Sequence, residues 1–98
     1  IESASIIAAE VPLDLVSKVH EVSILHIEIN GKHNRNAHSD LMASKQLLAT
    51  ASIIGAYNVA ANLPEIPDHK RQAIESKLSK MMDEIENMLS ITLDWSES

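Results

Sequence analysis

The residues best suited to chemistry lie in one polar stretch, "NAHSDLMASK" at 36–45, which opens into a long apolar segment. Asp40 stands at the start of that segment, directly after His38 and Ser39. A carboxylate in the first turn of a helix complements the helix dipole and can serve there only to strengthen the helix. The same carboxylate can stabilise a cationic group in an active site, with His38 as a candidate for proton transfer. The residues alone favour the helix-strengthening interpretation of Asp40 and leave the catalytic one as the alternative.

Two amide side chains form a second candidate group. Asn58 and Asn62 are four residues apart, so on a helix they share one face. A pair of amides can bind the donor–acceptor edge of a heterocyclic ligand, and it can equally join two helices of a bundle. The residues favour neither interpretation.

The histidines do not have the spacing of a metal site. His20 and His26 are six residues apart and point to different helix faces, while His33 and His38 fall in a predicted loop. Two ligands on one helix face need a spacing of three or four residues, and the sequence has no Glu-x-x-His motif. We therefore expect no bound metal.

The composition predicts one small all-α domain over residues 1–98. Apolar residues make up 45% of the chain and aromatic residues only 2%, so the core must be aliphatic, which suits helix packing. The net charge of −6 argues against nucleic acid as a partner. The absence of cysteine excludes disulfides and thiolate zinc sites. We find no stretch with the uninterrupted length of a membrane span and no signal peptide, and so expect a cytoplasmic protein that does not enter a membrane.

Periodicity and breaking residues predict an up-and-down bundle of three long helices, over residues 1–29, 39–62 and 68–93. Breaks are expected near 31–38, which is rich in asparagine, and near 63–68, which holds two prolines. Ser39 and Asp68 are the expected N-caps. The segment "ILHIEI" at 24–29 is rich in β-branched residues, but its neighbourhood favours helix over strand.

Two residues inside the predicted helices demand an explanation. Pro12 should kink the first segment or divide it into two helices end to end. Gly55 costs about 1 kcal/mol in a helix relative to alanine, which points to the close approach of another helix or of a ligand. The helix that holds Gly55 is apolar nearly all round, so two neighbours would leave part of it uncovered. We therefore expect self-association or packing against another chain through this helix.

Four segments, in order, resemble one enzyme family: "EVPL" at 10–13, "HNRNAHSDL" at 33–41, "GAYNVAANL" at 55–63 and "IPD" at 66–68. They resemble the C-terminal part of formimidoyltetrahydrofolate cyclodeaminase and its relative, methenyltetrahydrofolate cyclohydrolase. The matching positions are Asn34, Ser39, Asp40, Asn58, Val59, Asn62 and Leu63. His33 departs from the glycine usual in that family. The Gly-rich segment of the family's N-terminal half has no counterpart here, and the chain starts inside a helical pattern, so we expect a C-terminal half.

The resemblance implies a dimeric all-helical bundle and one-carbon chemistry on a reduced folate. In the cyclodeaminase reaction, N10 attacks the formimino carbon on N5 and ammonia leaves; in the cyclohydrolase reaction, water attacks the methenyl bridge. Neither reaction needs a metal or redox cofactor. The resemblance implies that Asp40 stabilises the cation and that the two amides at 58 and 62 bind the pterin. Asn34 and Ser39 are also candidate substrate-binding residues, which shape the adjoining loop and cap or else contact the ligand directly. The alternative is a non-catalytic helical module that binds other proteins.

Overall fold

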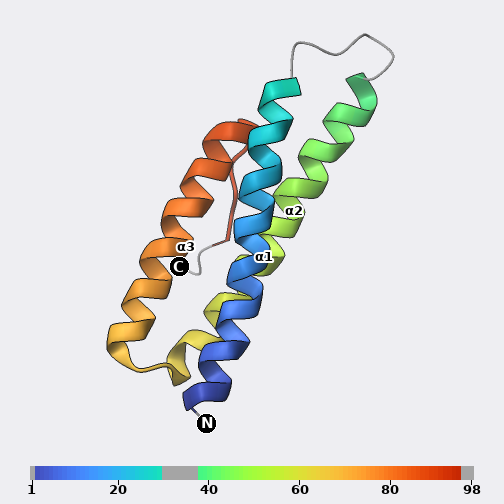
Figure 1. Cartoon of the computed structure of the whole chain (residues 1–98). Helices are drawn as coiled ribbons and strands as arrows, with labels where there is room; N and C mark the ends of the chain where they lie inside the picture. The colour runs from blue at the N-terminus through green and yellow to red at the C-terminus, as the bar shows by residue number, and fades with distance from the viewer. Residues whose placement is uncertain (1, 30–37, 96–98) are drawn as a thin grey trace.

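The computed structural model describes residues 2–29 and 38–95 and contains three long helices that run up, down and up (Figure 1). They are α1 (Glu2–Ile29), α2 (His38–Asn62) and α3 (Asp68–Leu89), with a short 3-10 turn, η2 (Leu63–Glu65), after α2. No strand occurs in the described ranges. The all-α prediction is confirmed, and it holds for residues 24–29 as well, which belong to α1.

The core lies where α1 packs against both other helices. Val16 of α1 and Val59 of α2 are completely buried, as are Met82 and Ile85 of α3. The predicted apolar stripe of α3 is confirmed, because Ile74, Leu78, Met81, Met82, Ile85 and Leu89 are all buried. Aliphatic side chains and methionines make this core, with no aromatic residue among its fully buried members.

Pro12 does not divide the first helix, since α1 is continuous from Glu2 to Ile29. A proline has no backbone N–H, so the carbonyl of Ala8, four residues earlier, loses its helical donor. The side-chain amide of Asn62 in α2 donates to that carbonyl at 3.4 Å. This hydrogen bond from α2 thus partly replaces the backbone donor that Pro12 lacks, which explains how α1 continues through Pro12 as one helix.

Gly55 lies where α1 and α2 approach closely. A Cβ atom built on Gly55 would stand 2.7 Å from Cγ2 of Val16 and 3.3 Å from the carbonyl oxygen of Pro12. The predicted close approach is confirmed, and the neighbour is a helix. Glycine here allows α2 to lie against the α1 backbone.

The helix ends differ from prediction at three places. α2 begins at His38, so Ser39 lies inside the first turn and is not the cap. α3 has Pro67 at its N-cap, and the carboxylate of Asp68 pairs with Arg71 instead of capping. The third helix was expected to reach residue 93, but it ends at Leu89, and Ser90 follows in the left-handed conformation with φ 53°.

The residues after α3 turn back along the bundle (Figure 1). The backbone N–H of Leu93 donates to the Glu86 carboxylate at 2.6 Å, and the hydroxyl of Tyr57 donates to the Asp94 carbonyl at 3.1 Å. Leu93 is buried in the core. Residues 91–95 therefore form an extended segment held by α2 and α3, in place of the helix that the sequence predicted as far as residue 93.

Uncovered apolar surface occurs on α1 as well as on the middle helix, where it was predicted. Val11, Leu25 and Ile29 of α1 are exposed, as are Leu47 and Ile54 of α2. An 18-residue window within His38–Glu65 reaches a mean hydropathy of 1.2, so this run is long and apolar enough to cross a membrane by length and composition. The expectation that no stretch reaches such a length is therefore wrong for this helix.

Candidate functional site

The N-terminal end of α2 presents His38, Ser39 and Asp40, all of them exposed. Asp40 lies in the first turn, as predicted, where the positive end of the helix dipole favours a negative charge. Its carboxylate makes no hydrogen bond or ion pair with any residue that the structure describes. The fourth predicted residue of this region, Asn34, lies outside the described residues. This end of α2 therefore offers a ligand an exposed carboxylate that has no partner among the described residues.

The other end of α2 carries the two candidate amides, and they have different surroundings. Asn62 is partly buried, and its side-chain nitrogen donates to the carbonyls of Ala8 and Asn58, the second at 2.8 Å. Asn58 is exposed, and within the described ranges its side chain forms no hydrogen bond. Asn62 thus joins two helices, and Asn58 is the amide that remains available to a ligand.

The two ends of α2 are far apart. Asp40 and Asn58 belong to one continuous helix and are eighteen residues apart. At about 1.5 Å per residue, about 27 Å of helix separates them. The fold therefore does not bring the predicted carboxylate and amides into one site within a single chain.

A hollow adjoins the Asn58 end. It has a volume of about 430 Å³ and is lined by Tyr57, Ala60, Ala61 and Pro64. Small side chains at 60 and 61 leave the space, and the Tyr57 ring borders it while its hydroxyl binds the Asp94 carbonyl. A planar ring fits such a surface better than a compact anion, because the lining is apolar and aromatic and offers no cation.

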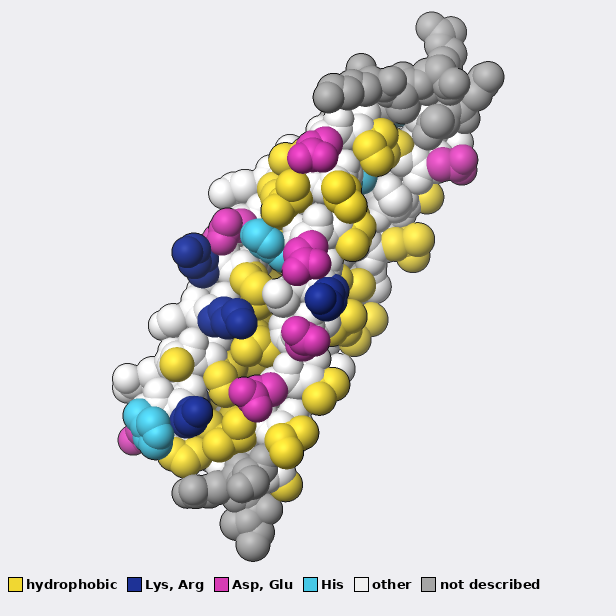
Figure 2. Space-filling view, viewed as in Figure 1, with side chains coloured by type: hydrophobic (Ala, Val, Ile, Leu, Met, Phe, Trp, Pro, Cys, Tyr) yellow, Lys and Arg dark blue, Asp and Glu magenta, His cyan; other side chains and the backbone are white. Residues whose placement is uncertain are grey.

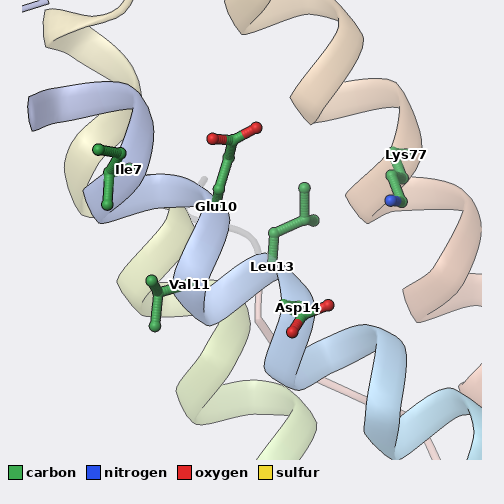
Figure 3. A pocket seen from close by; sticks show the side chains of 6 residues that line it. All are labelled: Ile7, Glu10, Val11, Leu13, Asp14 and Lys77. Atoms are coloured by element: carbon green, nitrogen blue, oxygen red, sulfur yellow. The ribbon is translucent and has the colours of Figure 1, made fainter. Parts of the chain in front are cut away.

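A second hollow lies between α1 and α3, with a volume of about 400 Å³ (Figure 3). Glu10 and Asp14 of α1 and Lys77 of α3 border it, and no ion pair joins them among the described residues. The sequence interpretation passed over these two carboxylates. Their spacing of four residues on a helix, with Glu10 inside the "EVPL" segment, is the signal that would have drawn attention to them.

The described histidines form no metal centre. His26 is buried and its Nδ1 lies 3.1 Å from Oγ of Ser44. The Ser44 hydroxyl donates a hydrogen bond to the Leu41 carbonyl, so in its contact with His26 the serine oxygen accepts and the imidazole Nδ1–H donates. Burial, and then the nearby charge of Lys45, lower the pKa of His26. Across the described ranges, no three potential ligands come together to hold a metal ion.

Comparison with known proteins identifies the family. The formiminotransferase-cyclodeaminase family matches residues 1–85, which include both ends of α2. No curated protein and no solved structure matches the chain. Because the match covers most of the 98 residues, it confirms the resemblance carried by the four sequence segments. The chain belongs to the formiminotransferase-cyclodeaminase family.

Proposed function

We propose that this chain is the helical part of an enzyme of folate one-carbon metabolism, a cyclodeaminase or a cyclohydrolase. The substrate would be 5-formimidoyl- or 5,10-methenyltetrahydrofolate. The observation that carries the proposal is the family match over residues 1–85. The geometry supports it through an exposed carboxylate and an exposed amide at positions that resemble the family's own motifs.

Asp40 is the residue to which we assign electrostatic stabilisation. Both reactions pass through or start from a positively charged amidine or methenyl group at N5 and N10. An exposed carboxylate can approach that charge closely, and the helix backbone fixes its position. His38 precedes Asp40 by two residues at the same exposed end, so we assign it proton transfer to or from the attacking group.

Asn58 is the residue to which we assign contact with the pterin ring. Its exposed amide offers one donor group and one acceptor, which match the edge of a pterin. The hollow at residues 57–64 lies beside it and presents an aromatic and apolar lining to a planar ring. Ser39, and Asn34 outside the described residues, would shape the loop before α2. Asn62 would support the site by holding α1 against α2.

A single chain of this kind should not complete the site. Its carboxylate and its amide stand at opposite ends of α2, and neither described hollow contains both. Further protein is therefore part of the proposal: a second copy of the chain, and the Gly-rich half that the resemblance implies. Neither reaction calls for a metal or redox cofactor.

An assay that follows the absorbance of the methenyl group tests the proposal, since one reaction forms this group and the other consumes it. The assay compares the 98-residue chain with a longer protein that contains it, each as wild type and as Asp40→Asn. Asp40→Asn keeps the shape and removes the charge. We expect turnover by the longer protein and a loss of about 10-fold to 100-fold in kcat for its Asp40→Asn variant, since an exposed charge acts through a high dielectric. Full activity of that variant would reduce Asp40 to a helix-stabilising residue.

The second candidate function is a non-catalytic module that binds other helices. The exposed apolar side chains along α1 and α2 favour it, because a monomer rarely leaves so much apolar surface uncovered. The same assay separates the two. An absence of turnover of either folate by the longer protein would leave the binding module as the better account.

A further inference from the structure

His26 is a buried histidine that the proposed function does not use. Its side chain belongs to α1 and is only 8% exposed. Its Nδ1–H donates to Oγ of Ser44 at 3.1 Å, and the Ser44 hydroxyl donates to the Leu41 carbonyl at 2.8 Å. These two hydrogen bonds hold the imidazole ring at one angle and fix its tautomer. Nε2 is therefore the ring nitrogen without a proton, and its lone pair can accept one.

The Nε2 atom of His26 opens into an apolar groove between α1 and α2. Among the described residues, the one buried side-chain nitrogen or oxygen without a hydrogen bond is Nε2 of His20. Nε2 of His26 has no hydrogen-bond partner in the described ranges and is not buried in this way, so it reaches the surface. The groove that His26 lines has a volume of about 440 Å³, and its other lining residues include Val22, Leu25 and Leu48. Figure 2 shows hydrophobic side chains gathered where the end of α1 lies beside α2.

The surroundings of His26 keep its imidazole neutral. Burial, and then the nearby charge of Lys45, lower the pKa of His26 from its ordinary value of 6.5. At neutral pH the ring is therefore in the form whose Nε2 can accept a proton. A neutral imidazole with one nitrogen held by a hydrogen bond and the other facing a groove has the arrangement of a general base.

Asp40 lies at the same end of the bundle as His26. Asp40 and Ser44 are four residues apart on α2, so they share one side of the helix and their Cβ atoms are about 6 Å apart. Ser44 is also the residue that His26 contacts. The imidazole thus lies about one helical turn from the carboxylate to which cation stabilisation is assigned. By contrast, about 27 Å of helix separates that carboxylate from Asn58.

We propose that His26 is the general base of the folate reaction and that the apolar groove holds the benzoyl ring of the folate. The inference rests on the proposed function. In a reduced folate N10 is bonded directly to the benzoyl ring, so a ring in the groove places N10 beside Nε2 of His26 and the reacting carbon on the side of Asp40. Asn58 of the same chain is too distant to contact this folate, so its pterin is left to the further protein that the proposed function requires.

His26 moves one proton in each of the two reactions. In the cyclodeaminase reaction, N10 attacks the formimino carbon, the π pair of the C=N bond moves to the exocyclic nitrogen, and the N10 proton moves to Nε2. Nε2 then gives this proton to the exocyclic nitrogen, the bond from carbon to that nitrogen breaks, ammonia leaves, and the N5 lone pair completes the methenyl cation.

In the cyclohydrolase reaction, water is the attacking group. Its oxygen bonds to the methenyl carbon, the π pair of the methenyl group moves to N5, and Nε2 of His26 takes one proton from the water. Nε2 passes that proton to N5 as the bond between the carbon and N5 breaks. The second proton of the water goes to the solvent and leaves a formyl group on N10. His38 is exposed at the start of α2, so it can carry protons between the site and the solvent.

Chemical rescue in the longer protein tests the proposal. His26→Ala should lower kcat by about 100-fold or more and change KM little, because it removes the base and leaves the groove apolar. Added imidazole fits the space that the side chain leaves and should raise the rate of this variant by about tenfold or more. Pyrazole has nearly the same shape but is a far weaker base, so it should not. His20→Ala is the control, since His20 lies on the same helix but faces Glu84 of α3, and it should keep the wild-type kcat.

The outcomes separate a base from a side chain that only fills space. Equal rescue by imidazole and pyrazole would overturn the proposal, and so would a wild-type kcat in His26→Ala. Turnover that survives His26→Ala would contradict this inference alone. An absence of turnover of either folate by the wild-type protein would contradict the proposed function, and this inference with it.

Chemical labelling gives a second readout that needs no variant. Diethyl pyrocarbonate acylates unprotonated imidazole nitrogens, and mass spectrometry locates the label. In the longer protein His26 should react, and 5-formyltetrahydrofolate at about ten times its Kd should slow that labelling by about tenfold. His69 is exposed on α3, away from the groove, and should react equally with and without this ligand. An unchanged rate at His26, under conditions where calorimetry shows the ligand bound, would overturn the proposal.

Discussion

Replacing Gly55 with alanine tests how closely α1 and α2 must approach. Two opposing effects act on this variant. Alanine in a helix interior is favoured over glycine by about 1 kcal/mol. The added Cβ, however, would stand 2.7 Å from Cγ2 of Val16 and 3.3 Å from the carbonyl oxygen of Pro12.

The steric effect should be the larger one. Val16 is completely buried and is β-branched, so its χ1 angle cannot turn aside without meeting other core atoms. The second contact is with backbone, which moves only if α1 moves. Overpacking of this kind costs about 1–3 kcal/mol. After subtraction of the gain in helix propensity, we expect Gly55→Ala to lower the free energy of unfolding by up to about 2 kcal/mol.

Urea unfolding followed by circular dichroism, at one fixed protein concentration, measures this change. Ala73→Gly, at an exposed position of α3, is the control that reports helix propensity alone. Val16→Ala removes the atom nearest to the new Cβ, so Gly55→Ala should cost less in that background than in wild type. If Gly55→Ala instead raised stability by about 1 kcal/mol, the helices would have room to spare and the reasoning would be wrong.

Three further changes have expected outcomes in the same unfolding measurement. Asn62→Ala should cost about 0.5–1 kcal/mol and less than that in a Pro12→Ala background, where residue 12 regains the N–H that its helix lacks; equal costs in both backgrounds would refute the coupling. The pKa of His26 is lowered from 6.5 by burial and by Lys45, so its contribution to stability is present above pH 6.5 and is lost as the pH falls through the folded-state pKa. Stability should therefore drop between about pH 7.5 and about pH 5, and His26→Gln should reduce that drop; an unchanged drop would exclude His26 as its source. Ser90→Gly should add about 0.5–1 kcal/mol, because glycine adopts a positive φ without strain; a loss of stability would show that the serine side chain is needed.

The helices were predictable because periodicity and breaking residues act locally. The apolar spacing of α3 predicted its buried side, and Gly55 predicted a close approach. The separation of Asp40 from Asn58 was predictable too, since both were expected on one helix of known rise per residue.

Features that depend on distant contacts were not predictable in this way. The sequence predicted a kink or a break at Pro12, but α1 is continuous there. The amide that reaches the Ala8 carbonyl comes from Asn62, far along the chain, so this contact could not be predicted from the residues around Pro12. The end of α3 was misplaced because Ser90 is not a residue that usually adopts a positive φ. The exposed apolar side chains of α1, such as Val11, Leu25 and Ile29, were missed because an apolar periodicity tells which residues share a side of a helix, but not how much of that side is covered.

The central claim is that the Asp40 carboxylate stabilises the cationic form of a folate, and a ratio of affinities tests it most directly. Calorimetry on the longer protein would compare binding of 5,10-methenyltetrahydrofolate, which carries the positive charge, with 5-formyltetrahydrofolate, whose N5 substituent is neutral. We expect Asp40→Asn to lower the preference for the charged ligand by about tenfold, which corresponds to about 1.4 kcal/mol, while affinity for the neutral one changes little. An unchanged ratio in the Asp40→Asn variant would contradict the claim.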